Sequence, residues 1–239
     1  MNFQNKAMEG TIRNNIARIR DSIAKAALRA GREASEIKLM AVTKTVAEKK
    51  IIESIEAGID IIGENYVQEA KKKNVSLGNK AIEWHMIGHL QTNKAKEAVQ
   101  LFDMIHSVDR MDLAVELDRR SKLLERVTKI LIEVNISGEK TKRGVPQKNA
   151  IHLIRDMSAF RNLSVYGLMT MPPWFDDPEK TRPYFAALRE LRDRIIKEQF
   201  ENVAMRELSM GMSSDYQVAI EEGATLVRIG RDIFGARTG

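Results

Sequence analysis

Short apolar, β-branched runs alternate with longer stretches of helical periodicity along almost the whole chain. After a leading helix at about 9–29, the pattern predicts strands at 37–42, 60–62, 83–87, 104–107, 129–135, 164–168, 207–210 and 226–229. Helical patterns lie between them at 46–57, 65–75, 93–101, 111–126, 147–160, 179–200 and 214–222, with a short last helix within 232–236. Eight strand–helix units predict an α/β fold in which a parallel sheet closes into a single (β/α)8 TIM barrel; a doubly wound open sheet is the competing arrangement.

One domain is expected across 1–239, because no shift in composition and no low-complexity linker divides the chain. The leading helix would pack on the barrel. Four of the five prolines lie between Pro172 and Pro183 and predict a stiff rim segment after the sixth strand. The polar loop 137–145 (SGEKTKRGV) is either a mobile lid or a solvated loop.

Composition narrows the class of protein. The chain has no cysteine, which excludes disulfides and thiolate metal sites. It has no apolar leader and no run of about 20 apolar residues, so we expect a cytoplasmic protein that does not enter a membrane. The net charge of +6 could indicate nucleic-acid binding, but the basic residues are dispersed and aromatic residues make up only 5%. The lysine run at 71–73 is interpreted as a solvated helix face.

Lys44 ends the first predicted strand, IKLMAVTK. Alternation places Met40, Val42 and Lys44 on one face, toward the mouth of the barrel, where TIM barrels carry their functional residues. Desolvation beside apolar neighbours lowers the pKa of an ammonium group and frees an amine for Schiff-base formation. A lysine that snorkels to solvent at a strand end is the alternative.

The loops after the seventh and eighth strands have the character of a phosphate site. The first, SMGMSSDY, contains Gly211 and the pair Ser213 and Ser214, and the second, RIGRDIFG, contains Gly230. Glycine allows close approach of the backbone, and free amides and hydroxyls bind anions. These two loops are the usual phosphate site of TIM barrels, although each alone could be an ordinary Ser/Gly turn. A lysine with a phosphate site predicts a phosphorylated carbonyl ligand.

Eight motifs in order give the chain a family resemblance. It resembles the YggS/PROSC group of pyridoxal phosphate homeostasis proteins, which are similar to the N-terminal barrel of alanine racemase standing alone. The motifs are AVTKT at 41–45, GENYVQEA at 63–70, WHMIGHLQTNK at 84–94, HSVD at 106–109, VNISGEKTKRGV at 134–145, GLMTMPP at 167–173, LSMGMSSDYQVAIEEGAT at 208–225 and VRIGRDIFG at 227–235.

The resemblance implies a site for pyridoxal 5′-phosphate. In it Lys44 would form the internal aldimine, Arg228 would face the pyridine nitrogen, and Ser213, Gly230 and the backbone of Arg231 would hold the phosphate. Ser214 is a further phosphate candidate, Asn65 would lie near the cofactor, and Met169, Met171, Met210 and Met212 would line the pocket. The cofactor-binding residues expected from the sequence are therefore Lys44, Asn65, Met210, Ser213, Ser214, Arg228, Gly230 and Arg231.

Three function classes remain open on the sequence. The first is a monomeric, non-enzymatic carrier that supplies the cofactor to pyridoxal-phosphate-dependent apoenzymes, a role that the resemblance implies. The second is an enzyme such as a weak amino-acid racemase, for which the sequence shows no acid or base opposite Lys44. Racemases resembling this barrel add a β-rich domain with a tyrosine base, and the sequence given ends at Gly239, after the eighth unit, so we expect no two-base racemase. The third is nucleic-acid binding, which only the positive charge suggests.

Histidines and tyrosines near the predicted mouth are further candidates for ligands or bases. His85, His89 and His106 and the tyrosines Tyr66 and Tyr216 follow or end predicted strands. The spacing of His85 and His89 suits metal ligands on a helix, but Gly88 intervenes and the segment has a strand pattern, so no metal is expected. We predict hydrogen bonds from His89 and Gln91 around the site, and tyrosines packed with their hydroxyls at the rim.

Overall fold

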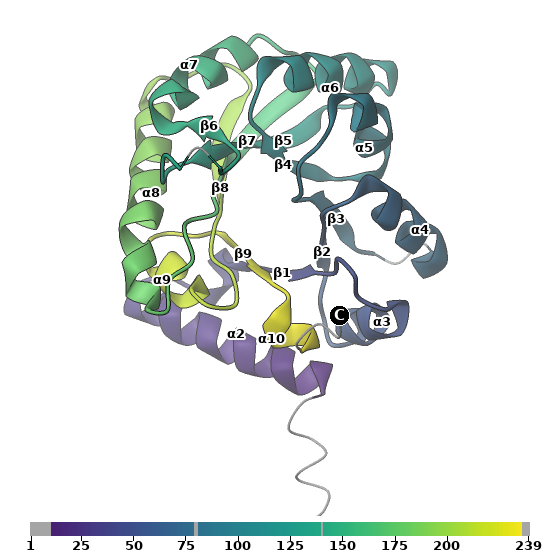
Figure 1. The fold of residues 1–239 in the computed structure, drawn as a ribbon, viewed down its shortest axis with the longest axis vertical. Helices are drawn as coiled ribbons and strands as arrows, with labels where there is room; N and C mark the ends of the chain where they lie inside the picture. The colour runs from purple at the N-terminus through teal and green to yellow at the C-terminus, as the bar shows by residue number, and fades with distance from the viewer. Residues whose placement is uncertain (1–10, 79–80, 140, 236–239) are drawn as a thin grey trace, which may run out of the picture.

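A closed parallel barrel forms the centre of the computed structural model, which describes residues 11–78, 81–139 and 141–235 (Figure 1). Neighbouring strands pair in the order β1-β2-β3-β4-β5-β7-β8-β9, and β9 returns to β1, so the TIM-barrel prediction is confirmed and the open sheet is wrong. The strands are β1 (Lys38–Val42), β2 (Ile61–Glu64), β3 (Glu83–Met86), β4 (Met104–Val108), β5 (Thr128–Asn135), β7 (Leu163–Met169), β8 (Val203–Ser209) and β9 (Leu226–Ile229).

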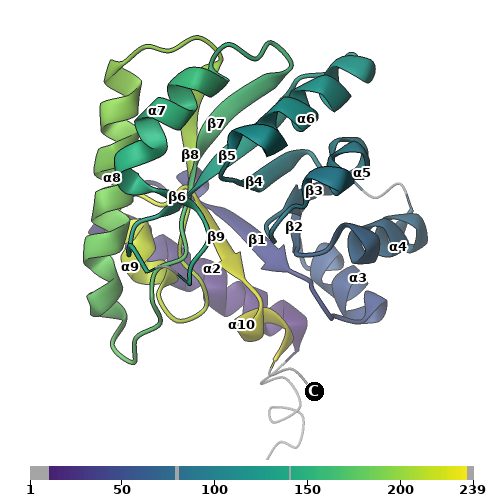
Figure 2. The same ribbon diagram turned by 45° about the horizontal axis from the view of Figure 1, so that its top comes forward.

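Helices surround the barrel between successive strands, as the turned view in Figure 2 also shows. They are α2 (Ile12–Arg29), α3 (Glu48–Glu56), α4 (Val67–Leu77), α5 (Ala95–Leu101), α6 (Met111–Leu123), α7 (Gln147–Met157), α8 (Arg182–Lys197), α9 (Tyr216–Glu221) and α10 (Arg231–Phe234), with 3-10 turns η1 (Ala34–Glu36), η2 (Thr92–Lys94) and η3 (Pro178–Thr181).

Most predicted elements lie where the periodicity placed them, and the last strand has the predicted bounds. One strand was not predicted: β6 (Val145–Pro146), which follows the loop 137–145 and pairs with the end of β5. The helix predicted at 179–200 is a 3-10 turn, η3, followed by α8. The start predicted for the leading helix, at residue 9, falls outside the described residues.

Strand alternation divides the apolar residues into an inner and an outer set, because successive side chains point to opposite faces of the sheet. Met40, Ile61 and Leu226 form one inner cluster, and Met104, Leu131 and Met169 form another. Leu39 and Ala41 belong instead to the large cluster between barrel and helices. The orientation predicted for β1 is therefore confirmed at Met40.

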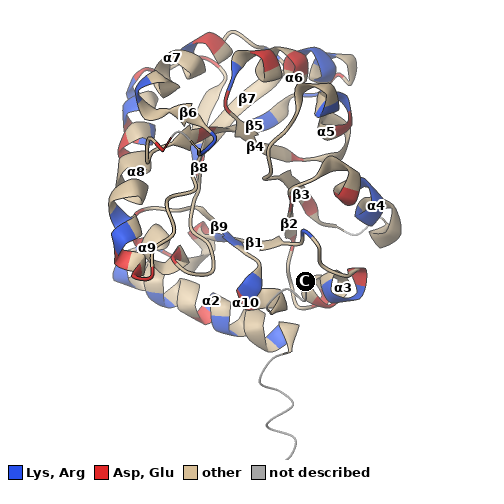
Figure 3. Cartoon of the chain, viewed as in Figure 1, with Lys and Arg blue, Asp and Glu red and all other residues tan. Residues whose placement is uncertain are grey.

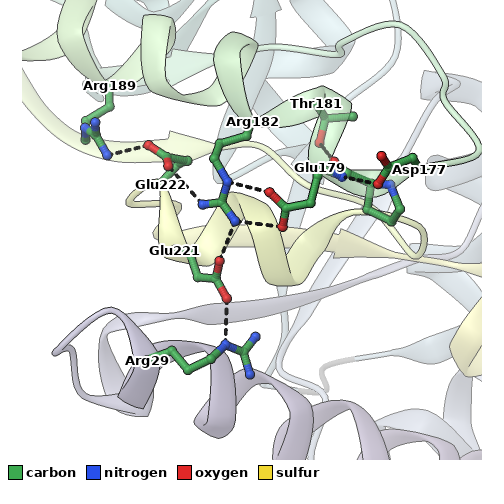
Figure 4. A network of polar contacts seen from close by, with 9 residues as sticks. Arg29, Asp177, Glu179, Thr181, Arg182, Arg189, Glu221 and Glu222 are labelled. Atoms are coloured by element: carbon green, nitrogen blue, oxygen red, sulfur yellow. Dashed lines mark hydrogen bonds and ion pairs between the residues drawn. The ribbon is translucent and has the colours of Figure 1, made fainter.

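The leading helix α2 packs against α9 and α10, the two short helices beside β8 and β9. In Figure 1, α2 runs beneath these two helices. An ion-pair network holds this corner together (Figure 4). Arg182 pairs with Glu179 at 2.7 Å and with Glu221 and Glu222 at 2.7 and 3.0 Å. Glu221 also pairs with Arg29 of α2 at 2.7 Å. The network thus connects α2 and α8 to α9, the helix that follows the predicted phosphate loop.

Residues of both charge signs are spread over the outer helices in the view of Figure 3. In the described ranges, no helix combines the length and apolar character that crossing a membrane requires.

Candidate functional site

A cavity of about 480 Å³ opens at the carboxyl ends of β1, β8 and β9, the end of a TIM barrel that carries its active site. It is lined by Val42, Lys44, Val46, Trp174, Met212, Ser213, Ser214, Arg228, Gly230, Arg231, Asp232, Phe234 and Gly235. A larger cavity of about 790 Å³ lies at the amino ends of the strands, beside Lys38, Asp60 and Glu83. We take the smaller cavity as the site because it gathers the lysine and both predicted phosphate loops.

Lys44 lies in the turn directly after β1, and its two neighbours are held by carboxylates. The hydroxyl of Thr43 donates to Glu64 Oε1 at 2.6 Å. The backbone N–H of Thr45, whose φ is 60°, donates to Glu69 Oε1 at 2.6 Å. Together with a bond from Lys73 to the carbonyl of Thr43, these bonds hold the residues on both sides of Lys44, whose side chain lines the cavity.

Lys73 connects those two carboxylates and is buried, so the interpretation of 71–73 as a solvated face is wrong at this position. Its ammonium donates to Glu64 Oε1, Glu69 Oε1 and the carbonyl of Thr43, at 2.6 to 2.7 Å. Burial raises the pKa of Glu64, although bonds from Lys73 and Thr43 oppose that rise. Sequence reasoning missed this group because its members are separated along the chain; helical spacing from Glu69 to Lys73 was the available signal.

The two predicted phosphate loops meet at the other end of the cavity. The backbone N–H of Asp232, in the first turn of α10, donates to Ser213 Oγ at 3.4 Å. Gly211 has a φ of +89°, and a Cβ there would lie 2.6 Å from Ala219 Cβ, so this loop requires glycine. A Cβ on Gly230 would contact Val42 at 3.5 Å in the cavity lining. Small residues thus leave backbone amides and serine hydroxyls around a space that suits an anion.

Arg228, in the barrel interior on β9, also lines the cavity and is 4% exposed. Its Nη1 donates to Ser209 Oγ at 2.8 Å and its Nη2 to the carbonyl of Thr170 at 2.9 Å. Burial lowers the pKa of this guanidinium to about 10, against the opposing charges of Asp215 and Glu133. A guanidinium has five N–H donors, so others remain for a ligand.

The remaining predicted site residues divide between the cavity and its surroundings. Ser214, Arg231 and Met212 line the cavity. Asn65 and Met210 are not among its lining residues: Met210 is fully buried in the main hydrophobic cluster, and Asn65 Oδ1 is buried without a hydrogen-bond partner. Of the other two methionines, Met169 packs inside the barrel and Met171 is 49% exposed.

None of the tyrosines and histidines predicted near the mouth is among the residues that line the cavity. Tyr66 is 63% exposed, whereas Tyr216 is buried in the main cluster. His85 and His106 are inside the barrel, bonded to each other at 3.0 Å, and His89 Nδ1 is buried without a partner. Within the described part of the chain no three His, Asp or Glu residues are grouped as a metal site requires. Strand alternation was the signal that could have placed His85 and His106 inside.

Comparison with known proteins gives one consistent family. Residues 10–238 match the model of the alanine racemase N-terminal domain. The chain is 47% identical over 222 residues to a pyridoxal phosphate homeostasis protein of Aquifex aeolicus, covering 93% of this chain and 96% of the relative. A protein of the same name from Escherichia coli K12 is 39% identical over 232 residues, covering 95% and 97%.

Solved structures agree in fold. PipY of Synechococcus elongatus with pyridoxal phosphate bound has a TM-score of 0.78 at 36% identity, covering 89% of this chain and all of PipY. An alanine racemase of Clostridium difficile has a TM-score of 0.72 at 14% identity, covering 96% of this chain and 57% of the racemase, which is a likeness of fold alone. The lysine turn, the two glycine- and serine-bearing loops and these matches together show that the chain belongs to the family of pyridoxal phosphate homeostasis proteins, whose barrel is the alanine racemase N-terminal domain.

Proposed function

We propose that this protein binds pyridoxal 5′-phosphate as a Schiff base on Lys44 and acts in cofactor homeostasis rather than as an enzyme. The observation that carries the proposal is a single cavity lined by Lys44, by Arg228 and by the two loops that contain Ser213 and Gly230. The named relatives and PipY with its bound cofactor support the choice of ligand. We further propose that the protein is a monomer, that it is located in the cytoplasm, and that it supplies the cofactor to apoenzymes.

The residues present fit the chemistry of this cofactor. A volume of about 480 Å³ is in the range of small-molecule sites. The amine of Lys44 would condense with the aldehyde, releasing water, and the serines and amides around Gly230 would receive the phosphate. Free N–H groups of Arg228 would donate to the pyridine nitrogen, which favours the unprotonated ring. An unprotonated pyridine ring withdraws electrons less strongly than a protonated one, so this site would lower the reactivity of the bound cofactor toward amino acids.

The other ionisable groups favour a carrier over a racemase. Besides Lys44, the ionisable residues that line the cavity are Arg228, Arg231 and Asp232. Arginine does not exchange protons near neutral pH, and Asp232 belongs to the phosphate end, next to Ser213. Racemisation needs a second acid or base facing Lys44, and the described lining offers none there.

Absorbance after addition of pyridoxal phosphate tests the site. We expect a visible Schiff-base band that borohydride removes, with the reduced label recovered on the Lys44 peptide. Lys44→Ala should abolish the band, whereas Lys49→Ala, a change at an exposed lysine of α3, should leave it intact. A band that survives Lys44→Ala, or label scattered over surface lysines, would refute the assignment.

A separate assay tests the choice of carrier over enzyme. The loaded protein is incubated with L-alanine in deuterated water, and the Cα hydrogen is followed by NMR. We expect no exchange above that of free cofactor, together with transfer of the cofactor to an added apoenzyme. Exchange that Lys44→Ala eliminates would establish the racemase alternative instead.

A further inference from the structure

A chain of four hydrogen bonds crosses the interior of the barrel from Arg228 to Glu83. Arg228 Nη1 lies 2.8 Å from Ser209 Oγ, and Ser209 Oγ lies 3.0 Å from His106 Nδ1. His106 Nε2 lies 3.0 Å from His85 Nδ1, and His85 Nε2 lies 3.3 Å from Glu83 Oε2. The five residues come from β9, β8, β4 and β3, so only the closed barrel brings them together.

The two ends of the chain fix the direction of every bond. A guanidinium can only donate, so Ser209 Oγ accepts from Arg228 and its own hydrogen must go to its other partner, His106 Nδ1. A neutral His106 then carries its hydrogen on Nε2 and donates to His85. An ionised carboxylate can only accept, so His85 donates from Nε2 to Glu83. The arginine end and the carboxylate end therefore require the same direction, and each does so without the other.

The reverse direction carries two penalties. The hydroxyl hydrogen of Ser209 would have no acceptor in a fully buried position, which costs about 1–3 kcal/mol. An unprotonated His85 Nε2 would also face the carboxylate of Glu83, acceptor against acceptor. Charge on His106 is disfavoured as well, because burial first, and then His85 and Arg228, lowers its pKa well below 6.5.

We propose that Ser209, His106, His85 and Glu83 are positioning residues that form a one-way hydrogen-bond relay, in which each histidine donates from Nε2 and accepts at Nδ1, and that the relay fixes Arg228 for its ligand. The relay ends at the opposite mouth of the barrel, where the Glu83 side chain is 60% exposed and borders the larger cavity. Lys38 and Lys129 act on Glu83 electrostatically there. The hydrogen-bond directions stand on this structure alone, and the benefit to the cofactor rests on the proposed function.

Long-range 1H–15N correlation NMR of the histidine rings tests the relay, since it shows which ring nitrogen carries hydrogen. The full chain has four histidines, and exposed His152 serves as a reference in the same spectrum. At pH 7.5 we expect His85 and His106 each as a single neutral Nε2–H form, with or without pyridoxal phosphate. A ring found as the Nδ1–H form, as a mixture or as a cation would overturn the proposal.

Two single variants and their combination test whether both ends set the direction. In Glu83→Gln the arginine end still imposes it, and in Ser209→Ala the glutamate end does, so each single variant should keep the Nε2–H forms. The double variant loses both constraints and should show mixed tautomers. Retention of one pure form in the double variant, or loss of it in Glu83→Gln, would contradict control by the two ends.

Cofactor affinity tests the consequence for Arg228. Ser209→Ala should weaken pyridoxal phosphate binding roughly tenfold, as expected for one lost hydrogen bond to a charged group. Unchanged affinity would show that Ser209 does not position Arg228 for the ligand. If the unmodified protein bound no pyridoxal phosphate, the proposed function would fail while the NMR result on the relay would still stand.

Discussion

Replacing Glu133 by glutamine should make stability less dependent on pH. Glu133 lies near the end of β5 and is 9% exposed. Burial and the neighbouring Asp109 raise the pKa of its carboxyl from 4.5 to about 7, against the opposing charges of Arg228 and Arg143. The folded protein therefore holds a proton between pH 4.5 and 7 that the unfolded chain has released.

The size and sign of the effect follow from that difference. Because the folded state binds more protons, the contribution of Glu133 to stability is greatest below pH 4.5 and declines until the pH passes 7. At 1.36 kcal/mol for each pKa unit, the total decline is about 3 kcal/mol. That is a large share of the net stability of a typical domain, about 5–15 kcal/mol.

Urea unfolding at a series of pH values from 4 to 8 measures this effect. Subtracting the free energy of unfolding of the unmodified protein from that of Glu133→Gln removes the titration of all other groups. The difference should rise by about 3 kcal/mol toward pH 8. Glu48→Gln, at an exposed position of α3, controls for the loss of one carboxylate. A difference that is flat with pH would refute the reasoning, because Glu133 would then ionise in the folded protein as it does in water.

Three other substitutions test the surroundings of the site. Lys73→Met should destabilise the protein by about 3–5 kcal/mol in urea unfolding, because it leaves Glu64 buried and unpaired, and adding Glu64→Gln should recover part of that loss. Ser213→Ala should lower cofactor retention only moderately in equilibrium dialysis, since backbone amides remain; unchanged phosphate affinity would make Ser213 a helix cap only. Arg182→Ala should lower stability by about 1 kcal/mol, and less at high salt; an equal loss at every salt concentration would argue against an ionic origin.

The barrel could be predicted because its signal is local. Each β-branched run and each helical stretch can be recognised from neighbouring residues, and alternation along β1 alone predicts that Met40 and Lys44 share one face. The loops after β8 and β9 could be predicted for the same reason, since glycine and serine mark them directly. Boundaries were less certain where the chain continues through a 3-10 turn, as at η3.

The polar partners could not be predicted in this way. Lys73 looked like one member of a surface run, and only the fold brings it against Thr43 and Glu64. Met210, a predicted cofactor-binding residue, is fully buried in the main hydrophobic cluster and is not among the residues that line the cavity. Which side of a strand end a residue faces depends on the bend into the next loop, which periodicity does not describe.

The distribution of polar groups inside this barrel can be explained by the site. Branched apolar side chains usually fill a TIM-barrel interior, and two such clusters are present here. Buried polar groups are tolerated where each finds a partner, and the relay from Arg228 to Glu83 meets that condition. Glu133 and Asp215, two of the acids whose pKa burial raises, act electrostatically on Arg228, and Asp215 also accepts a hydrogen bond from the backbone N–H of Met212. Burial of these two carboxyl groups opposes their ionisation, and both lie close to the guanidinium that lines the cavity, as expected if this end of the barrel is arranged for a ligand rather than for stability.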